Sequence, residues 1–266
     1  MLNLLSFDLR QFISFNSGVK LIIFYICMFS TAAYEINLTL PHATIMDLCL
    51  FVFGGIPYHF DNIWFILRWL LIYGFSLYLI GDALDRDYRA NRLYLLIRIN
   101  SRCLYVLSKL ISLFVFACFY ILIGYLFACI YGAIFFEGKF NLSNEFIETF
   151  ELYGFSLNLG SIVLISILGL FCMFSIMLLL NILMGHSRFS IVYMVALLFF
   201  NAKFLTGLNM VSEYNFLNRT MGFQYLYHER EGTLYSLSGS FLCFFIYILL
   251  FSCLSLLIFR RKDRII

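Results

Sequence analysis

The chain has 266 residues, of which 63% are hydrophobic and only 12% charged, and its formal net charge is +3. Soluble globular domains are roughly 45–50% apolar and about 25% charged, so this composition excludes a soluble domain and indicates that the lipid bilayer is the solvent. The net positive charge does not indicate a nucleic-acid partner, because the distribution of Lys and Arg has a membrane explanation.

The first predicted element is an amphipathic helix within residues 1–18. At about 100° per residue, its apolar and polar side chains fall on opposite faces. The apolar face carries Leu2, Leu5, Leu9, Phe12 and Ile13, and the polar face carries Asn3, Arg10, Gln11 and Ser14. Such a helix lies in the plane of the membrane interface before the chain turns into the membrane. It either only anchors the chain or acts as an elbow helix that touches a cytosolic partner.

Six apolar segments reach the roughly 20 residues that a membrane-spanning helix needs. They cover residues 19–36, 62–81, 110–136, 159–184, 189–206 and 237–259. The segment Ile45–Ile56 is a rival seventh span, but it is too short to cross and carries Asp47. We interpret it as an interfacial or re-entrant element that ends at Gly54-Gly55. The predicted fold is therefore all-α, a single polytopic transmembrane domain over residues 1–266 with six spans after the elbow helix.

The positive charges predict the orientation, because short cytoplasmic loops collect Lys and Arg. With the N-terminus inside, 13 of the 18 Lys and Arg lie on the inner side, four lie on the outer side, and Arg68 lies within a span. Both termini are then cytoplasmic. The many Phe, Ile, Tyr and Asn residues are typical of an AT-rich bacterial genome, so the membrane we expect is a bacterial plasma membrane.

The inner segment 82–109 carries the strongest functional signal. Its first half predicts a short helix in which Asp85 pairs with Arg89, and Asn100-Ser101 predicts the cap of a new helix that runs into the third span. The candidate contact residues are Asp85, Asp87, Arg89, Arg92, Leu93, Tyr94, Leu96, Arg98, Ser101, Arg102 and Lys109. The alternative is a loop whose basic residues only set the orientation.

The order of residue types in this segment resembles the permeases of ABC-2 type transporters. An acidic stretch is followed by Arg-x-x-Arg-Leu-x-Leu-Leu-Ile-Arg-x-x-Ser-Arg from Arg89 to Arg102, and then by Lys109. The pattern is most similar to the small six-span subunits encoded with bacteriocin and lantibiotic export or immunity systems. That resemblance implies that the segment holds a coupling helix, which docks into an ATPase subunit. The Gly-Thr often found after the acidic residue in related permeases is absent, and Asn91-Arg92 stands at about that place.

The chain contains no G-x-x-x-x-G-K-[ST] motif, so we expect no ATP hydrolysis by the chain itself and no cofactor of its own. The resemblance implies that ATP is bound by a separate ATPase subunit. Two ATP sites imply two permease copies, as a homodimer or as a pair with a related permease. Asp82 and Asp85 begin like the double-Asp motif of membrane phosphatidyltransferases, but Arg86 stands where a Gly should follow. We therefore predict no metal site and no catalytic residue.

Three further features are candidate functional elements. Gly124, Ala128 and Gly132 form a stripe of small residues that permits close helix approach, either inside the subunit or at a dimer interface. Arg68 either extends to the outer interface or makes a polar contact in the translocation path. The outer loop 207–236 is either an ordinary interfacial loop or a re-entrant gate, in which Glu229 and Glu231 attract cationic peptides.

The expected function is that of the membrane-spanning permease subunit of an ABC transporter. It would move a peptide, such as an antimicrobial peptide, or another amphipathic substrate across the membrane, with an ATPase subunit and membrane lipid as partners. The alternative is a subunit that does not transport, and that anchors or senses within a membrane complex.

Overall fold

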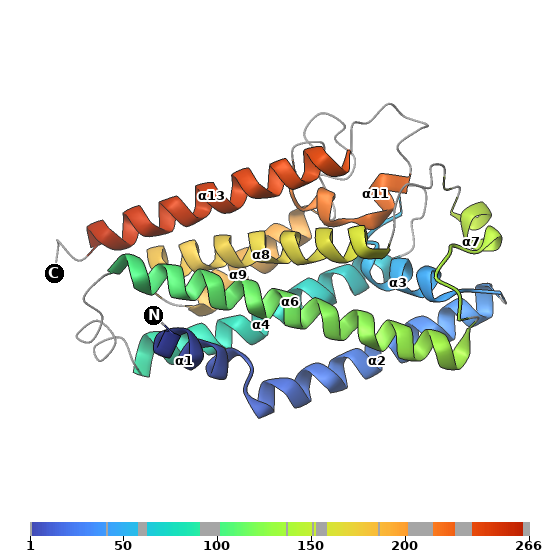
Figure 1. The fold of residues 1–266 in the computed structure, drawn as a ribbon, viewed down its shortest axis with the longest axis horizontal. Helices are drawn as coiled ribbons and strands as arrows, with labels where there is room; N and C mark the ends of the chain where they lie inside the picture. Colours follow the sequence, from blue (N-terminus) through green and yellow to red (C-terminus); the bar gives the residue numbers. More distant parts are fainter. Residues whose placement is uncertain are drawn as a thin grey trace.

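A computed structural model describes residues 2–40, 42–57, 63–90, 102–136, 138–150, 152, 159–185, 187–201, 215–226 and 236–262. All the regular elements in these ranges are helical (Figure 1). The predicted all-α class is therefore confirmed.

Five helices are long and apolar enough to cross a membrane. They are α2 (Phe15–Thr39), α4 (Ile63–Ala90), α6 (Arg102–Phe135), α8 (Leu159–Met184) and α13 (Leu237–Lys262). They correspond to five of the six predicted spans.

The remaining predicted span, residues 189–206, is shorter in the part of it that the structure describes. Its helix is α9 (Ser187–Phe200), with 14 residues. At about 1.5 Å per residue α9 is about 21 Å long, which is less than the roughly 30 Å hydrocarbon core of a bilayer. Residues 202–206 lie outside the described ranges. Five spans, not six, are therefore supported by helix length among the described residues.

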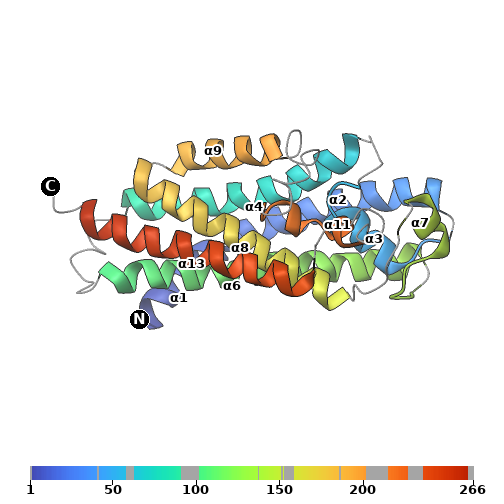
Figure 2. The same cartoon turned by 90° about the horizontal axis from the view of Figure 1, so that it is seen from above.

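The long helices run side by side along the long axis of the molecule (Figures 1 and 2). The helix α1 (Leu2–Phe12) and the last residues of α13 lie at one end, which we call the terminal end. The end of α4 and the beginning of α6 lie there too. The central helix is α8, which packs against α6, α9 and α13. In contrast, α13 buries little of its surface and leaves a broad apolar face exposed.

Short elements gather toward the other end of the bundle (Figure 1). They are α3 (Ile45–Phe53), α7 (Asn144–Thr149), the 3-10 turn η2 (Asn218–Thr220) and α11 (Gly222–Leu226). All the residues of α3 are buried, which is expected of a helix in which every residue except Asp47 is apolar. The segment predicted to be interfacial or re-entrant is thus a short helix that packs on α2, α4, α6 and α11.

Two tyrosine hydroxyls join three of the long helices. Tyr25 on α2 donates to the carbonyl oxygen of Tyr120 on α6 at 3.0 Å, and Tyr120 donates to the carbonyl oxygen of Ile72 on α4 at 2.7 Å. Both tyrosines are fully buried. Because hydrogen bonds between helices help to hold membrane bundles together, these two bonds fix the relative positions of α2, α4 and α6.

Candidate functional site

The candidate coupling segment is framed by two long helices. The helix α4 continues to Ala90, so Asp85, Asp87 and Arg89 lie on its last turns and not on a separate short helix as predicted. The helix α6 begins at Arg102, directly after the predicted cap at Ser101. The remaining candidate contacts lie outside the described residues. They are Arg92, Leu93, Tyr94, Leu96, Arg98 and Ser101.

The side chain of Lys109, the last candidate of this segment, is buried inside the protein. Its Nζ donates to Oδ1 of Asp8 on α1 at 2.6 Å, and both side chains are 1% exposed. The hydroxyl of Ser108 donates to the other carboxylate oxygen of Asp8 at 3.0 Å. Lys109 therefore cannot touch a partner directly while this arrangement holds. We call Asp8, Ser108 and Lys109 the α1–α6 tie.

Aromatic rings surround the tie. The ammonium of Lys109 lies 5.8 Å from the ring centroid of Phe12 and 5.4 Å from that of Tyr105, at distances where the ring faces attract a cation. Phe12 also packs against Phe116 on α6. The side of α1 that carries Asp8 and Phe12 thus faces α6 rather than lipid. This differs from the predicted elbow helix, whose apolar face would lie on the membrane.

Asp8 was not among the residues predicted from the sequence, although the sequence contains a signal for it. Asp8 is three residues after Leu5 and four before Phe12, so it lies at the edge of the apolar face of α1. A carboxylate on an apolar helical face needs a partner, because a buried charge without one is costly. The partner is about 100 residues away in the chain and only the fold identifies it.

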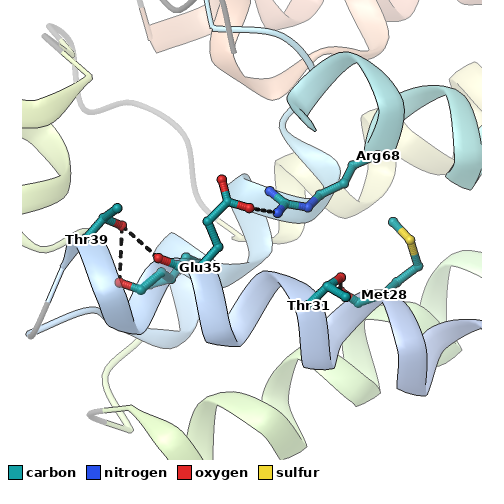
Figure 3. Close-up of polar contacts among 6 residues, drawn as sticks. Met28, Thr31, Glu35, Thr39 and Arg68 are labelled. Carbon is teal, nitrogen blue, oxygen red and sulfur yellow. Dashed lines mark hydrogen bonds and ion pairs between the residues drawn. The ribbon is translucent and has the colours of Figure 1, made fainter. Parts of the chain in front are cut away.

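A second ion pair joins α2 and α4 inside the bundle (Figure 3). Arg68 on α4 extends toward α2 and donates through Nη2 to Oε2 of Glu35. Its guanidinium also lies 4.4 Å from the ring centroid of Phe51 on α3. Arg68 is 6% exposed, so its side chain is buried against other parts of the protein. The other terminal nitrogen, Nη1, is buried and has no hydrogen-bond partner among the residues that the structure describes.

The stripe of small residues on α6 faces other helices of the same chain. A Cβ at Gly124 would lie 2.5 Å from Cζ of Phe53 on α3 and 2.8 Å from the hydroxyl of Tyr25 on α2. A Cβ at Gly132 would lie 2.6 Å from Cγ1 of Ile45 on α3. Ala128, between the two glycines, is fully buried. The stripe lets α2 and α3 approach α6, and it does not offer its small side chains to a second copy of the chain.

A polar cluster joins the end of α9 and the beginning of α13 to the segment from Asn215 to Arg219. Asn201, at the end of α9, donates to Oδ1 of Asn218 at 3.1 Å, and Asn215 donates to Asn201. Arg219 donates to the hydroxyl of Ser240 on α13 at 2.9 Å. Asn201, Asn218, Arg219 and Ser240 are all buried, and none of them was predicted as a site. The predicted Glu229 and Glu231 lie outside the described residues.

Irregular backbone is tolerated inside a membrane protein only where other protein groups or a cavity satisfy it. The segment from Asn215 to Leu226 meets this condition through the polar cluster and through a bond from the hydroxyl of Tyr225 to the carbonyl of Arg219 at 2.8 Å. A backbone bond of 2.9 Å from Phe223 to Gly54 joins it to the end of α3.

Among the described residues, no group of three or more His, Cys, Asp or Glu could hold a metal ion. The chemistry available at these places is therefore charge pairing and hydrogen bonding between helices. No curated protein and no solved structure matches the chain. The family model described as "Protein of unknown function (DUF2705)" matches residues 21–265. Because this match covers more than half of the sequence, the chain belongs to the DUF2705 family.

Proposed function

We propose that the chain is the membrane-spanning permease subunit of an ABC transporter in a bacterial plasma membrane, driven by a separate ATPase subunit. Its cargo is a peptide, of which an antimicrobial peptide is one case, or another amphipathic substrate. Two permease copies, identical or related, would assemble with the ATPase subunits.

The observation that carries this proposal is the extension of α4 beyond its apolar part. The apolar part of α4 ends at Leu84, but the helix continues for six more residues to Ala90. These residues read DRDYRA, and four of the six are charged. A helix that extends beyond its apolar span with charged residues presents a firm docking element, in contrast to a loop that only sets orientation.

The charges favour a cytosolic position for this connection. Residues 82–109 contain six Lys and Arg. The terminal end also holds α1, which carries Arg10 in its last turn, and the last turns of α13, which carry Arg260. The opposite end contains Glu145 and Glu148 on α7. Under the positive-inside rule the terminal end faces the cytosol, where an ATPase subunit would be found. Both termini would then be cytoplasmic.

The transport path is proposed to use the polar residues buried in the bundle. Polar and charged side chains within membrane spans are costly and often mark the path of a substrate or ion. Arg68 and the cluster around Asn201 and Arg219 are such side chains. They lie toward the end opposite the proposed ATPase, so movement of α4 and α6 would have to be transmitted along these helices to reach them.

Affinity purification of the tagged full-length chain from membranes in mild detergent tests the proposal. We expect an ATPase with a P-loop to copurify in the wild type. Asp87→Lys should reduce the amount of ATPase recovered. The matched control is Glu148→Lys, the same charge reversal on an exposed residue of α7, which should leave recovery unchanged. A chain that purifies without any ATPase would instead be a membrane anchor or sensor, and the permease proposal would be wrong.

A further inference from the structure

We propose that Asp8 is a positioning residue for energy coupling, which acts through Lys109 to tie α1 to the first turns of α6. With this tie intact, α1 and the ATPase-facing end of α6 move as one unit. The inference rests on the proposed function and deepens it, because it assigns a role to residues that do not touch the ATPase.

The first step of the argument is the position of the tie along α6. The helix begins at Arg102, and Lys109 lies two turns further on. The residues 91–101 lead directly into this helix. A displacement of this segment by a bound ATPase would therefore reach Lys109 through about two turns of continuous helix.

The second step is the number of attachments. Two successive residues of α6, Ser108 and Lys109, donate to the two different carboxylate oxygens of Asp8. A single bond would let α1 turn about its own axis, whereas two bonds to one carboxylate restrict that rotation. The contact of Phe12 with Phe116 adds a third point of attachment, one turn further along α1.

The third step is burial. Asp8 and Lys109 are each 1% exposed, so both charges of the pair are shielded from water in this structure. Separating a buried ion pair leaves two uncompensated charges, and removing one partner of such a pair is strongly destabilising. The tie is therefore much firmer than an exposed ion pair, which contributes little.

The fourth step is the place of α1 between the two flanking helices. It packs against α6 and also contacts α4. The segment 91–101 connects the end of α4 to the beginning of α6. Because α1 touches both helices, it can keep their ends together while the ATPase pulls on the connection between them.

The test compares two double variants of the full chain, each purified with its ATPase and placed in lipid nanodiscs. The neutral pair, Asp8→Asn with Lys109→Met, removes both buried charges and keeps similar side-chain volumes. The reversed pair, Asp8→Lys with Lys109→Asp, exchanges the charges and keeps an ion pair. The measured quantity is the change in ATP hydrolysis rate that the permease causes, relative to the isolated ATPase, so no transport substrate is needed.

In the neutral pair we expect recovery of the ATPase to stay at the wild-type level. The permease-dependent change in the ATP hydrolysis rate should fall about fivefold or more, which is a typical size for the loss of coupling between two sites. The reversed pair should regain most of that change. Arg10→Gln removes a charge from the exposed side of α1 and serves as the control, with wild-type behaviour expected. If a double variant fails to accumulate, Asp8→Glu and Asp8→Asn are compared in the same way, with the larger effect expected in Asp8→Asn.

The outcomes separate the two proposals. A wild-type chain without any ATPase overturns the proposed function, and this inference falls with it. The inference alone is overturned if the wild-type chain changes the hydrolysis rate and the neutral pair changes it by the same amount. A reversed pair that performs no better than the neutral pair also overturns it, because an ion pair in either direction should hold α1 to α6.

Discussion

Asp47 on α3 accepts a hydrogen bond from the backbone N–H of Ser143, the residue that caps α7, at 3.1 Å. Its other carboxylate oxygen accepts a hydrogen bond from the backbone N–H of Thr44 at 2.9 Å, and the hydroxyl of Thr44 caps the beginning of α3. One carboxylate thus joins the beginnings of two short helices at the end of the bundle opposite the termini. Burial raises the pKa of Asp47, and the hydrogen bonds from Ser143 and Thr44 lower it in part.

Replacing this carboxylate should loosen that end of the bundle. Asp47→Ala removes both hydrogen bonds, and leaving a buried backbone N–H without its acceptor typically costs about 1–3 kcal/mol of stability. We expect a lower Tm for the purified chain in detergent. Glu148→Ala, on the exposed side of α7, is the control and should leave Tm unchanged. An equal Tm for Asp47→Ala and the wild type would show that the Asp47 bonds do not hold α3 and α7 together.

The glycines of α6 give a prediction about packing. Gly124→Leu and Gly132→Leu should each reduce the amount of folded chain in the membrane, because even a Cβ at these positions would overlap Phe53 or Ile45. Overpacking of a filled core costs about 1–3 kcal/mol. The matched control is Gly74→Leu on α4, where a Cβ would meet no atom within 4 Å. Folded protein is measured by size-exclusion chromatography in detergent, and normal yields of both variants would place the stripe against lipid.

The Glu35–Arg68 ion pair predicts that removing one of its charges destabilises the protein more than removing both. Glu35→Gln leaves the buried guanidinium of Arg68 without its countercharge and should lower stability by about 3 kcal/mol. The double variant Glu35→Gln with Arg68→Met removes both charges, and its stability should lie closer to that of the wild type. Thermal unfolding in detergent measures both. Equal stability of Glu35→Gln and the wild type would mean that Glu35 does not compensate the charge of Arg68.

The proposed orientation of the chain in the membrane can be tested by labelling introduced Cys residues with a membrane-impermeant thiol reagent. A Cys substituted for Arg92 should react only after the cells are opened, and a Cys substituted for Glu148 should react in intact cells. The exposed native Cys27, Cys103 and Cys253 are first changed to Ser to remove background. Reaction of position 92 from outside intact cells would reverse the orientation and place the segment 82–109 out of reach of an ATPase.

The long helices were predictable from sequence because each is a run of apolar residues longer than a bilayer requires. The span predicted at residues 189–206 is described only as far as Asn201, and its apolar sequence shows no sign that the side chain of Asn201 is bonded to Asn218 and Asn215. The buried pairs were not predictable. Glu35 and Arg68 are 33 residues apart in the chain, and Asp8 and Lys109 are 101 apart, and hydropathy contains no information about which distant charges meet.

Local signals were more reliable at helix boundaries than for the role of single residues. The beginning of α6 at Arg102 agrees with the predicted cap before it, because capping depends on neighbouring residues. The burial of Lys109 could not be read in the same way, since a lysine next to an apolar run equally fits a position at the membrane surface. Only the packing of α1 on α6 decides where that ammonium lies.

The measurement that tests the central claim most directly is the affinity of the ATPase for variants of the segment 82–109. We predict weaker binding for Asp87→Lys and Arg92→Glu, which change candidate charges at the rim of the contact. Truncating an apolar anchor in the middle of the contact should cost on the order of 2 kcal/mol, which corresponds to about thirtyfold in affinity. The candidate anchors are Leu93, Tyr94 and Leu96. If all of these variants reach the membrane and bind the ATPase with wild-type affinity, the segment only sets orientation and the chain is not the permease of an ABC transporter.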